Sequence, residues 1–250
     1  MPSLKLRIPG ALGYPLDARL DLPENQTTAF GIMAHCFTCT KETLTTARVC
    51  RGLSRLGYAM LRIDFTGLGN SEGDFADTNF TSMVEDILLA DEFLAESYQA
   101  ARFLIGHSMG GTASLVASLQ LPQVHSVVTI ASPSKPEHVL HHFGPVLEQL
   151  EAGLDASIHV AGQPYPVRPQ FLTDVKSIDM PRKMQTFDRQ LLVLRAGHDA
   201  LVDAIDADEI AAYSSNSQIV DFAEADHLFT DRAISEEMIG VIGNWLTSNI

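Results

Sequence analysis

Basic residues and long apolar runs are both scarce in this chain. Lys and Arg number 17 against 31 Asp and Glu, so the formal net charge at pH 7 is −14. A surface this acidic repels phosphate backbones and anionic lipids, which argues against nucleic-acid and membrane partners. No apolar run approaches the ~18 residues that span a bilayer. Residues 1–7 have no apolar core followed by a small-residue cleavage site, so we expect no signal peptide.

Cysteine is scarce as well. Only Cys36, Cys39 and Cys50 are present, and three cysteines cannot all pair or build a disulfide framework. We therefore expect reduced thiols in a cytoplasmic protein. Hydrophobic residues, in contrast, make up 46% of 250 residues, which is enough for one sizeable core. The composition predicts a soluble globular chain whose oligomeric state stays open, with a homodimer as one option.

Strand-length apolar runs alternate with stretches of helical periodicity along most of the chain. This alternation, with short connections, predicts a parallel sheet with helices on both faces. Residues 4–8 and 16–22 flank a turn with Gly and Pro and predict an antiparallel hairpin at one edge. The expected fold is thus α/β, with a mostly parallel eight-stranded sheet. The other predicted strands are 29–34, 59–65, 102–105, 124–130, 190–195 and 218–222, and the helices are 42–56, 80–97, 109–119, 204–213 and 234–247.

One connection, between residues 131 and 190, is much longer than the others. It has roughly 55 residues where a crossover requires about a dozen. Because it leaves the carboxyl side of the sheet, we expect a small lid over a site, with a decorative excursion as the alternative. The predicted domains are a core of residues 1–133 and 190–250 and a lid of residues 134–189. Within the lid we expect a helix at 137–150, a hairpin of 157–160 and 165–168, and helical or irregular structure at 174–189.

The strongest motif is Gly106-His107-Ser108-Met109-Gly110, which follows a predicted strand and precedes an apolar helix. It matches G-x-S-x-G, in which a serine sits on a sharp strand-to-helix turn. Glycines on both sides remove Cβ atoms that would clash in this turn. The free N–H groups of the following helix favour a developing oxyanion. Ser108 is therefore the predicted nucleophile.

A serine hydroxyl requires a base, and neutral imidazole serves this purpose near pH 7. His227 stands just beyond the last predicted strand, at the sheet edge where Ser108 is expected. Asp199 is the first acid after the preceding strand and is the predicted partner that orients His227. His198 is an alternative base, whereas Asp203 falls into the next helix and is expected to be solvated.

The chain order Ser108, Asp199, His227 is typical of the α/β-hydrolase superfamily, which this chain resembles over essentially its whole length. The resemblance implies an oxyanion hole made by two backbone N–H groups. One is that of Met109, directly after the nucleophile. The other lies in the loop after the third strand and maps to Phe37.

Two segments carry a narrower resemblance. His35-Cys36-Phe37-Thr38 resembles the His-Gly-Phe-Thr loop of feruloyl and related carboxylesterases, and residues 64–73 resemble their D-x-x-G-x-G-x-S-x-G segment. Residues 35–41 and 64–75 look more like the hydrolase half of fusion proteins with an OsmC-type domain, and we expect no such domain within these 250 residues. Cys36 replaces the glycine of the esterase pattern and adds a Cβ and a thiol beside the oxyanion hole, which leaves the acyl preference and the oxyanion donor open.

The residues Cys36 and Cys39 also form a C-x-x-C motif, for which zinc binding and a redox dithiol are the rival interpretations. Zinc needs further ligands that the sequence does not offer, so we expect ordinary loop thiols and no metal or cofactor. His35, Cys36, Phe143 and Tyr165 are expected to line the substrate pocket, although burial in the lid's own core is an alternative for the last two. His141 and its neighbour His142 are expected on a solvated helix face.

Together these features predict a carboxylesterase-type serine hydrolase that forms an acyl-enzyme intermediate. A small lid favours soluble esters with short- to medium-chain acyl groups. A thioesterase, lysophospholipase, peptidase or carbon–carbon bond hydrolase would use the same triad. The alternative from another class is a thiol redox or binding protein that uses Cys36 and Cys39.

Overall fold

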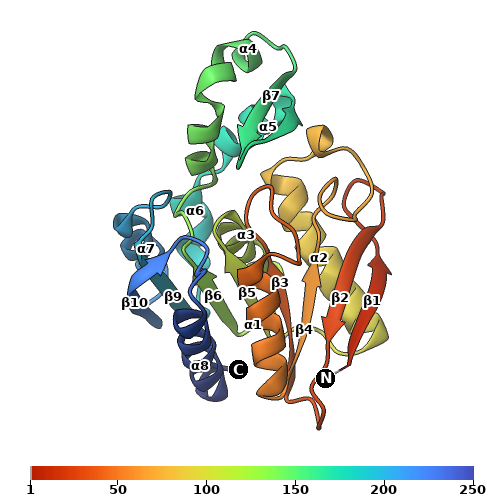
Figure 1. The fold of residues 1–250 in the computed structure, drawn as a ribbon, viewed down its shortest axis with the longest axis vertical. Coiled ribbons are helices and arrows are strands. Elements are labelled where there is room, and N and C mark those ends of the chain that lie inside the picture. Colours follow the sequence, from red (N-terminus) through yellow and green to blue (C-terminus); the bar gives the residue numbers. More distant parts are fainter. Residues whose placement is uncertain (1) are drawn as a thin grey trace.

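The computed structural model describes residues 2–250. Its central sheet has eight strands in the order β1-β2-β4-β3-β5-β6-β9-β10 (Figure 1). The first two strands pair antiparallel, β2 pairs antiparallel with β4, and all other neighbours are parallel. The predicted mostly parallel eight-stranded sheet is confirmed. Its strands are β1 (Ser3–Ile8), β2 (Leu16–Asp21), β3 (Ala29–Ala34), β4 (Tyr58–Ile63), β5 (Phe103–His107), β6 (Ser126–Ile130), β9 (Gln190–His198) and β10 (Ser217–Asp226).

Helices cover both faces of this sheet. In Figure 1, α1 and α8 lie together in front of the strands, and α2 and α3 lie behind them. Side-chain caps mark several starts: Asn79 and Ser82 form a capping box at α2, and Asp231 accepts the Ile234 N–H at α8. The core helices are α1 (Leu44–Arg55), η1 (Phe75–Asp77, one 3₁₀ turn), α2 (Phe80–Ser97), α3 (Met109–Ser118), α7 (Ala204–Ala211) and α8 (Arg232–Asn249).

The central strands are buried on both faces because side chains alternate across a strand. In β5, Phe103 and Ile105 belong to the hydrophobic cluster under α1 and α8, whereas Leu104 belongs to the larger cluster under α2 and α3. Such two-sided burial explains why these strands appear in the sequence as continuous apolar runs. The carboxyl ends of the parallel strands meet at one edge, which therefore collects the loops after β3, β5, β9 and β10.

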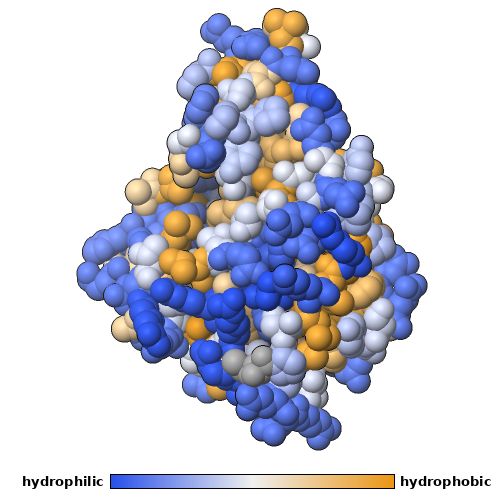
Figure 2. Space-filling view, turned by 45° about the vertical axis from the view of Figure 1, so that its right-hand side comes forward, coloured by the Kyte–Doolittle hydropathy of each residue, from blue (hydrophilic) through white to orange (hydrophobic). Residues whose placement is uncertain are grey.

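The insertion projects from that edge of the sheet (Figure 1). Figure 2 shows it as a narrower projection on a wider core, with hydrophobic and hydrophilic residues interspersed. Its hairpin turns at Ala161 and Gly162, whose φ angles of 50° and 77° suit a two-residue turn. The elements are η2 (Pro136–Val146), α4 (Leu147–Glu151), β7 (Ala156–Val160), β8 (Gln163–Val167), α5 (Pro169–Ser177), α6 (Met180–Lys183) and η3 (Met184–Thr186).

The predicted helix at 137–150 is wrong in its type. Residues Pro136–Val146 form 3₁₀ structure, and only Leu147–Glu151 is α-helical. Pro145 lies inside this stretch and has no N–H to donate, and Gly144 precedes it, so a continuous α-helix is disfavoured.

Nowhere in residues 2–250 is a helix long and apolar enough to cross a bilayer.

Candidate active site

Ser108 sits on the turn that joins β5 to α3. Its backbone has φ 53° and ψ −128°, a left-handed conformation that L-residues seldom adopt. The Ser108 N–H donates to Ile130 O at 2.8 Å, and the Ser108 carbonyl accepts from Gly111 N at 2.9 Å. These bonds hold the strained turn in place, and the Ser108 side chain lines a cavity.

The glycines of the motif are required by close packing around this turn. A Cβ on Gly106 would lie 2.2 Å from Gly110 O, and one on Gly110 would lie 2.4 Å from His35 O. Both atoms are backbone and cannot move aside as a flexible side chain could. The close approach also brings α3 against the loop after β3, which places Met109 beside residues 35–38.

His227 and Asp199 meet at the same edge. His227 Nδ1 lies 2.7 Å from Asp199 Oδ2, and the side chains are 11% and 3% exposed. Burial would raise the pKa of Asp199, but the bond from His227 and two backbone N–H bonds hold it below its usual value. The carboxylate accepts, so Nδ1 carries the proton and Nε2 is the ring nitrogen available as a base. In the described part of the chain, no hydrogen bond joins Nε2 to Ser108 Oγ; such bonds often tighten only when substrate binds.

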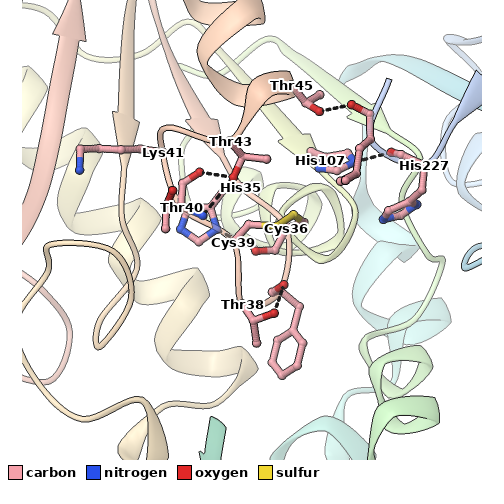
Figure 3. The surroundings of a disulfide bond; sticks show 12 residues. His35, Cys36, Thr38, Cys39, Thr40, Lys41, Thr43, Thr45, His107 and His227 are labelled. Carbon is pink, nitrogen blue, oxygen red and sulfur yellow. Dashed lines mark hydrogen bonds between the residues drawn. A yellow bond between two sulfur atoms is a disulfide. The ribbon is translucent and has the colours of Figure 1, made fainter. Parts of the chain in front are cut away.

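The loop that carries His227 is anchored by three side chains from other elements. Buried His107 donates from Nε2 to His227 O at 2.7 Å, and Thr45 donates to Leu228 O (Figure 3). Arg48 donates to Thr230 O at 2.8 Å. The first contact makes His107, the variable position of the nucleophile motif, a neighbour of the candidate base. Sequence reasoning missed this role because nothing in the motif indicates what His107 contacts.

Phe37 and Met109 are the two sequence-predicted oxyanion donors. Among residues 2–250, neither backbone N–H has a hydrogen-bond partner. Both residues line the cavity that Ser108 and His227 share. Two unpaired N–H groups beside a strained serine are what an oxyanion requires, since they would bind charge that develops only during the reaction.

The cavity has a volume of about 450 Å³, within the range of small-molecule sites. Its walls come from the loop after β3, from the insertion and from the loops after β9 and β10. No Lys or Arg is among the described residues that line it. Apolar side chains such as Phe37, Val139 and Leu201 form much of its wall, which suits apolar groups of a substrate.

A family model described as serine aminopeptidase, S33, matches residues 39–177. The esterase domain of a Rhodothermus marinus protein superposes with a TM-score of 0.81 and is 33% identical, covering 100% of this chain and 99% of that one. The chain belongs to this S33 serine hydrolase family. Est1E from Butyrivibrio proteoclasticus with bound ferulic acid shares the α/β-hydrolase fold, with a TM-score of 0.80, 17% identity and coverage of 98% of each chain.

A curated relative matches a smaller part of the chain. The palmitoyl-protein thioesterase ABHD10 of Mus musculus is 32% identical over 97 residues, which is 38% of this chain and 32% of that protein. The match thus spans about a third of the relative's length. With the Rhodothermus domain, it establishes a serine hydrolase of the α/β-hydrolase superfamily but not a substrate.

Two of the predicted pocket residues of this S33 hydrolase do not line the cavity. His35 is fully buried; its Nδ1 donates to Cys36 O at 2.7 Å, and its Nε2 accepts from Phe65 N at 3.3 Å. Phe143 is also fully buried, stacked on Phe171 with ring centroids 5.2 Å apart. The lid's own core takes this aromatic side chain. Cys36 and Tyr165 do line the cavity.

Three histidines of the insertion line the cavity instead: His138, His141 and His142. His141 is exposed, as expected, whereas the expected solvated position of His142 is wrong. His142 is half-buried and stacks on Phe37 at 6.2 Å; burial and the neighbouring His141 and His138 lower its pKa to about 4. His142 is thus neutral near pH 7. Among the described residues, no three side chains are grouped to hold a metal ion.

The expectation of free loop thiols is also wrong. Cys36 and Cys39 form a disulfide, with their Cα atoms 5.3 Å apart, and only Cys50 is a free buried thiol. The C-x-x-C spacing permits this bond because the chain turns back directly after β3. The spacing alone could not distinguish it from two thiols.

Proposed function

We propose that this serine hydrolase cleaves carboxylic esters with short- to medium-chain acyl groups through Ser108, His227 and Asp199. One observation carries the proposal: the strained serine and a carboxylate-bound histidine line one cavity together with the unpaired N–H groups of Phe37 and Met109. Ester hydrolysis by these groups involves no oxidation or reduction.

In the proposed reaction, Ser108 Oγ attacks the ester carbonyl while His227 Nε2 takes its proton. Asp199 holds the ring and stabilises the imidazolium, and the Phe37 and Met109 N–H groups bind the oxyanion. His227 then protonates the leaving alcohol. Water attacks the acyl-enzyme by the same route and restores Ser108.

The cavity supports a small, uncharged substrate. Its 450 Å³ is closed on one side by Tyr165, whose hydroxyl donates to Thr38 O at 3.1 Å. Cationic lining residues that would hold a phosphate or carboxylate are absent from its described walls. A neutral ester of modest size fits these walls better than an anionic one or a lipid aggregate.

A thioesterase is the second candidate. The name of the mouse relative, a palmitoyl-protein thioesterase, supports it, and the oxyanion geometry serves oxygen esters and thioesters alike. A non-enzymatic redox or binding role is less supported, because it gives no purpose to the Asp199–His227 pair. Cytoplasmic location, a homodimer and the absence of nucleic-acid and membrane partners stay predictions.

The test is a panel of 4-nitrophenyl esters from acetate to palmitate beside matched acyl thioesters. We expect the highest kcat/KM on short or medium oxygen esters, with a decline toward palmitate as the chain outgrows the cavity. Faster turnover of the matched thioesters would favour the thioesterase. No turnover of either series by folded protein would contradict the proposal.

A further inference from the structure

The disulfide closes the turn that carries the Phe37 N–H. Cys36 is the second residue after β3, and Cys39 N donates to Cys36 O at 3.1 Å. The bonded sulfurs close a ring that contains residues 36–39 (Figure 3). The proposed oxyanion donor is thus inside a covalent ring of four residues. Any change in this ring acts directly on the donor.

Thr38 shows that the ring fixes an unfavourable backbone. Its φ is 58°, in the left-handed region that β-branched residues avoid. Such a conformation persists only where its surroundings determine it. The ring ends are tied by the disulfide, while the chain beyond is anchored separately by Lys41, whose N–H donates to Asp64 at 2.6 Å. Opening the disulfide would therefore remove the covalent tie across the turn, while the Tyr165 bond to Thr38 O and the Lys41 anchor remain.

The disulfide is open to the substrate cavity. Cys36 and Cys39 both line it; Cys36 is 5% exposed, and Cys39 is half-buried. Cys50 is different, because it is fully buried in α1 and faces the core. A small molecule that enters the cavity therefore meets Cys39 at its wall but not Cys50.

We propose that the Cys36–Cys39 disulfide is a thiol-exchange site for small thiols that enter through the substrate cavity, and that its reduction displaces the Phe37 N–H. A thiolate of an incoming dithiol attacks Cys39 Sγ, a mixed disulfide forms, and Cys36 leaves as a thiolate. The second thiol of the dithiol then displaces Cys39. The dithiol loses two electrons and closes to a cyclic disulfide, and the loop gains them as two thiols after protonation.

Reduction changes the catalytic loop because two thiols cannot stay at bonding distance. The ends of the turn separate, Thr38 leaves its left-handed conformation, and the Phe37 N–H moves from the oxyanion position. This consequence rests on the proposed hydrolase function. The loss of one oxyanion donor typically lowers kcat by about 10²–10³, and a displaced donor should cost on the order of tenfold or more.

The test uses the Cys50→Ala variant, in which the loop holds the only cysteines, and short-chain ester hydrolysis as the readout. Treatment with a dithiol should lower kcat on the order of tenfold, with a smaller change in KM, and reoxidation should restore it. Alkylation and mass spectrometry count the thiols formed. The Cys39→Ser variant cannot form the disulfide, so its kcat should equal that of the reduced enzyme and should not change when the dithiol is added. Equal kcat in oxidised, fully reduced and Cys39→Ser protein would overturn the proposal.

A second arm tests the route of entry. A phosphonate with an alkyl chain, bound to Ser108, fills the cavity and should slow reduction of the disulfide several-fold relative to free enzyme. Equal reduction rates would overturn entry through the cavity. The proposed function fails differently: oxidised protein would then hydrolyse no ester and take up no phosphonate, which would also remove the catalytic consequence inferred here.

Discussion

The loops at the sheet edge and the insertion above them are held by different forces. The His227 loop has three of its carbonyls bound by His107, Thr45 and Arg48 from β5 and α1. These are backbone positions fixed by elements of the core. The loop geometry therefore depends on the sheet and not on the substrate.

The insertion depends instead on aromatic packing. Phe143 and Phe171 of the insertion pack on Phe37, with ring centroids 6.3 and 5.6 Å away. Its ion pairs with the core, such as Arg168 with Asp74 at 3.7 Å, are exposed and contribute little. The sheet edge thus positions the candidate triad, and the insertion forms part of the cavity wall. The two regions should respond differently to substitution.

The largest expected effect is at the sheet edge. Asp199→Asn should lower kcat by roughly 10⁴ because His227 loses the partner that holds its tautomer, while the melting temperature changes little. The matched control is Asp203→Asn, since Asp203 is exposed at the start of α7 and its side chain makes no cap bond. Steady-state kinetics of both variants decide; the reverse order would make Asp203 the acid.

In the insertion, Phe143→Ala should act mainly on stability. Loss of a fully buried phenyl group costs about 3–5 kcal/mol of unfolding free energy, measured by urea unfolding. Because Phe143 does not line the cavity, the relative rates on esters of graded length should change little at temperatures where the variant is folded.

Tyr165→Ala is the comparison for Phe143→Ala. Tyr165 lines the cavity, is only half-buried and bonds Thr38 O. Its removal should shift the preferred acyl length and cost less stability. If Phe143→Ala shifts the preference and Tyr165→Ala does not, the assignment of cavity wall and lid core is contradicted.

His107 of β5 donates to the backbone of the loop that carries His227, and its substitution should have a moderate effect on kcat. His107→Ala leaves the carbonyl of His227 without its donor and should lower kcat by about tenfold, the order expected for 1–2 kcal/mol of lost positioning. His107→Gln can still donate and should recover most of the rate. Equal loss in both variants, with intact folding, would contradict positioning through this bond.

The last effect concerns acid stability and not turnover. Burial lowers the pKa of His107 to about 3 and that of His35 to about 4. The unfolded chain, in which histidine has a pKa of about 6.5, binds more protons than the native state below that pH. The stabilisation is therefore full above about pH 6.5 and is lost as the pH falls toward 4. Urea unfolding at pH 7 and 5 should show this decline, and His107→Gln should flatten it; an equal slope in both would contradict it.

The sheet could be predicted because local patterns decide it. Short apolar runs that alternate with amphipathic helices are typical of a parallel sheet covered on both faces. For the same reason Ser108, Asp199 and His227 could be placed together, since each follows a parallel strand. The pattern did not predict how the His227 loop is held. The bond from His107 to the His227 carbonyl depends on tertiary contacts that sequence spacing does not encode.

The insertion was harder to predict because competing rules were close in strength. Apolar periodicity at 137–150 favoured a helix, but the conformational limits of Pro145 and the neighbouring glycine prevailed. Phe143 and Tyr165 are both aromatic, and only the packing shows that Phe143 is in the core and Tyr165 at the cavity. The partial burial of His142 also depends on packing, which is why the sequence placed it in solvent.

The central claim is that Ser108 is the activated nucleophile at this sheet edge. A fluorophosphonate probe, with the modified peptide identified by mass spectrometry, tests it most directly. We predict stoichiometric labelling of Ser108 in the wild type and none in Ser108→Ala. Labelling should be unchanged in Ser134→Ala, because the Ser134 hydroxyl is engaged with the carboxylates of Asp206 and Glu209, at 2.8 and 2.6 Å. Labelling that persists in folded Ser108→Ala, or that lies on another serine, would contradict it.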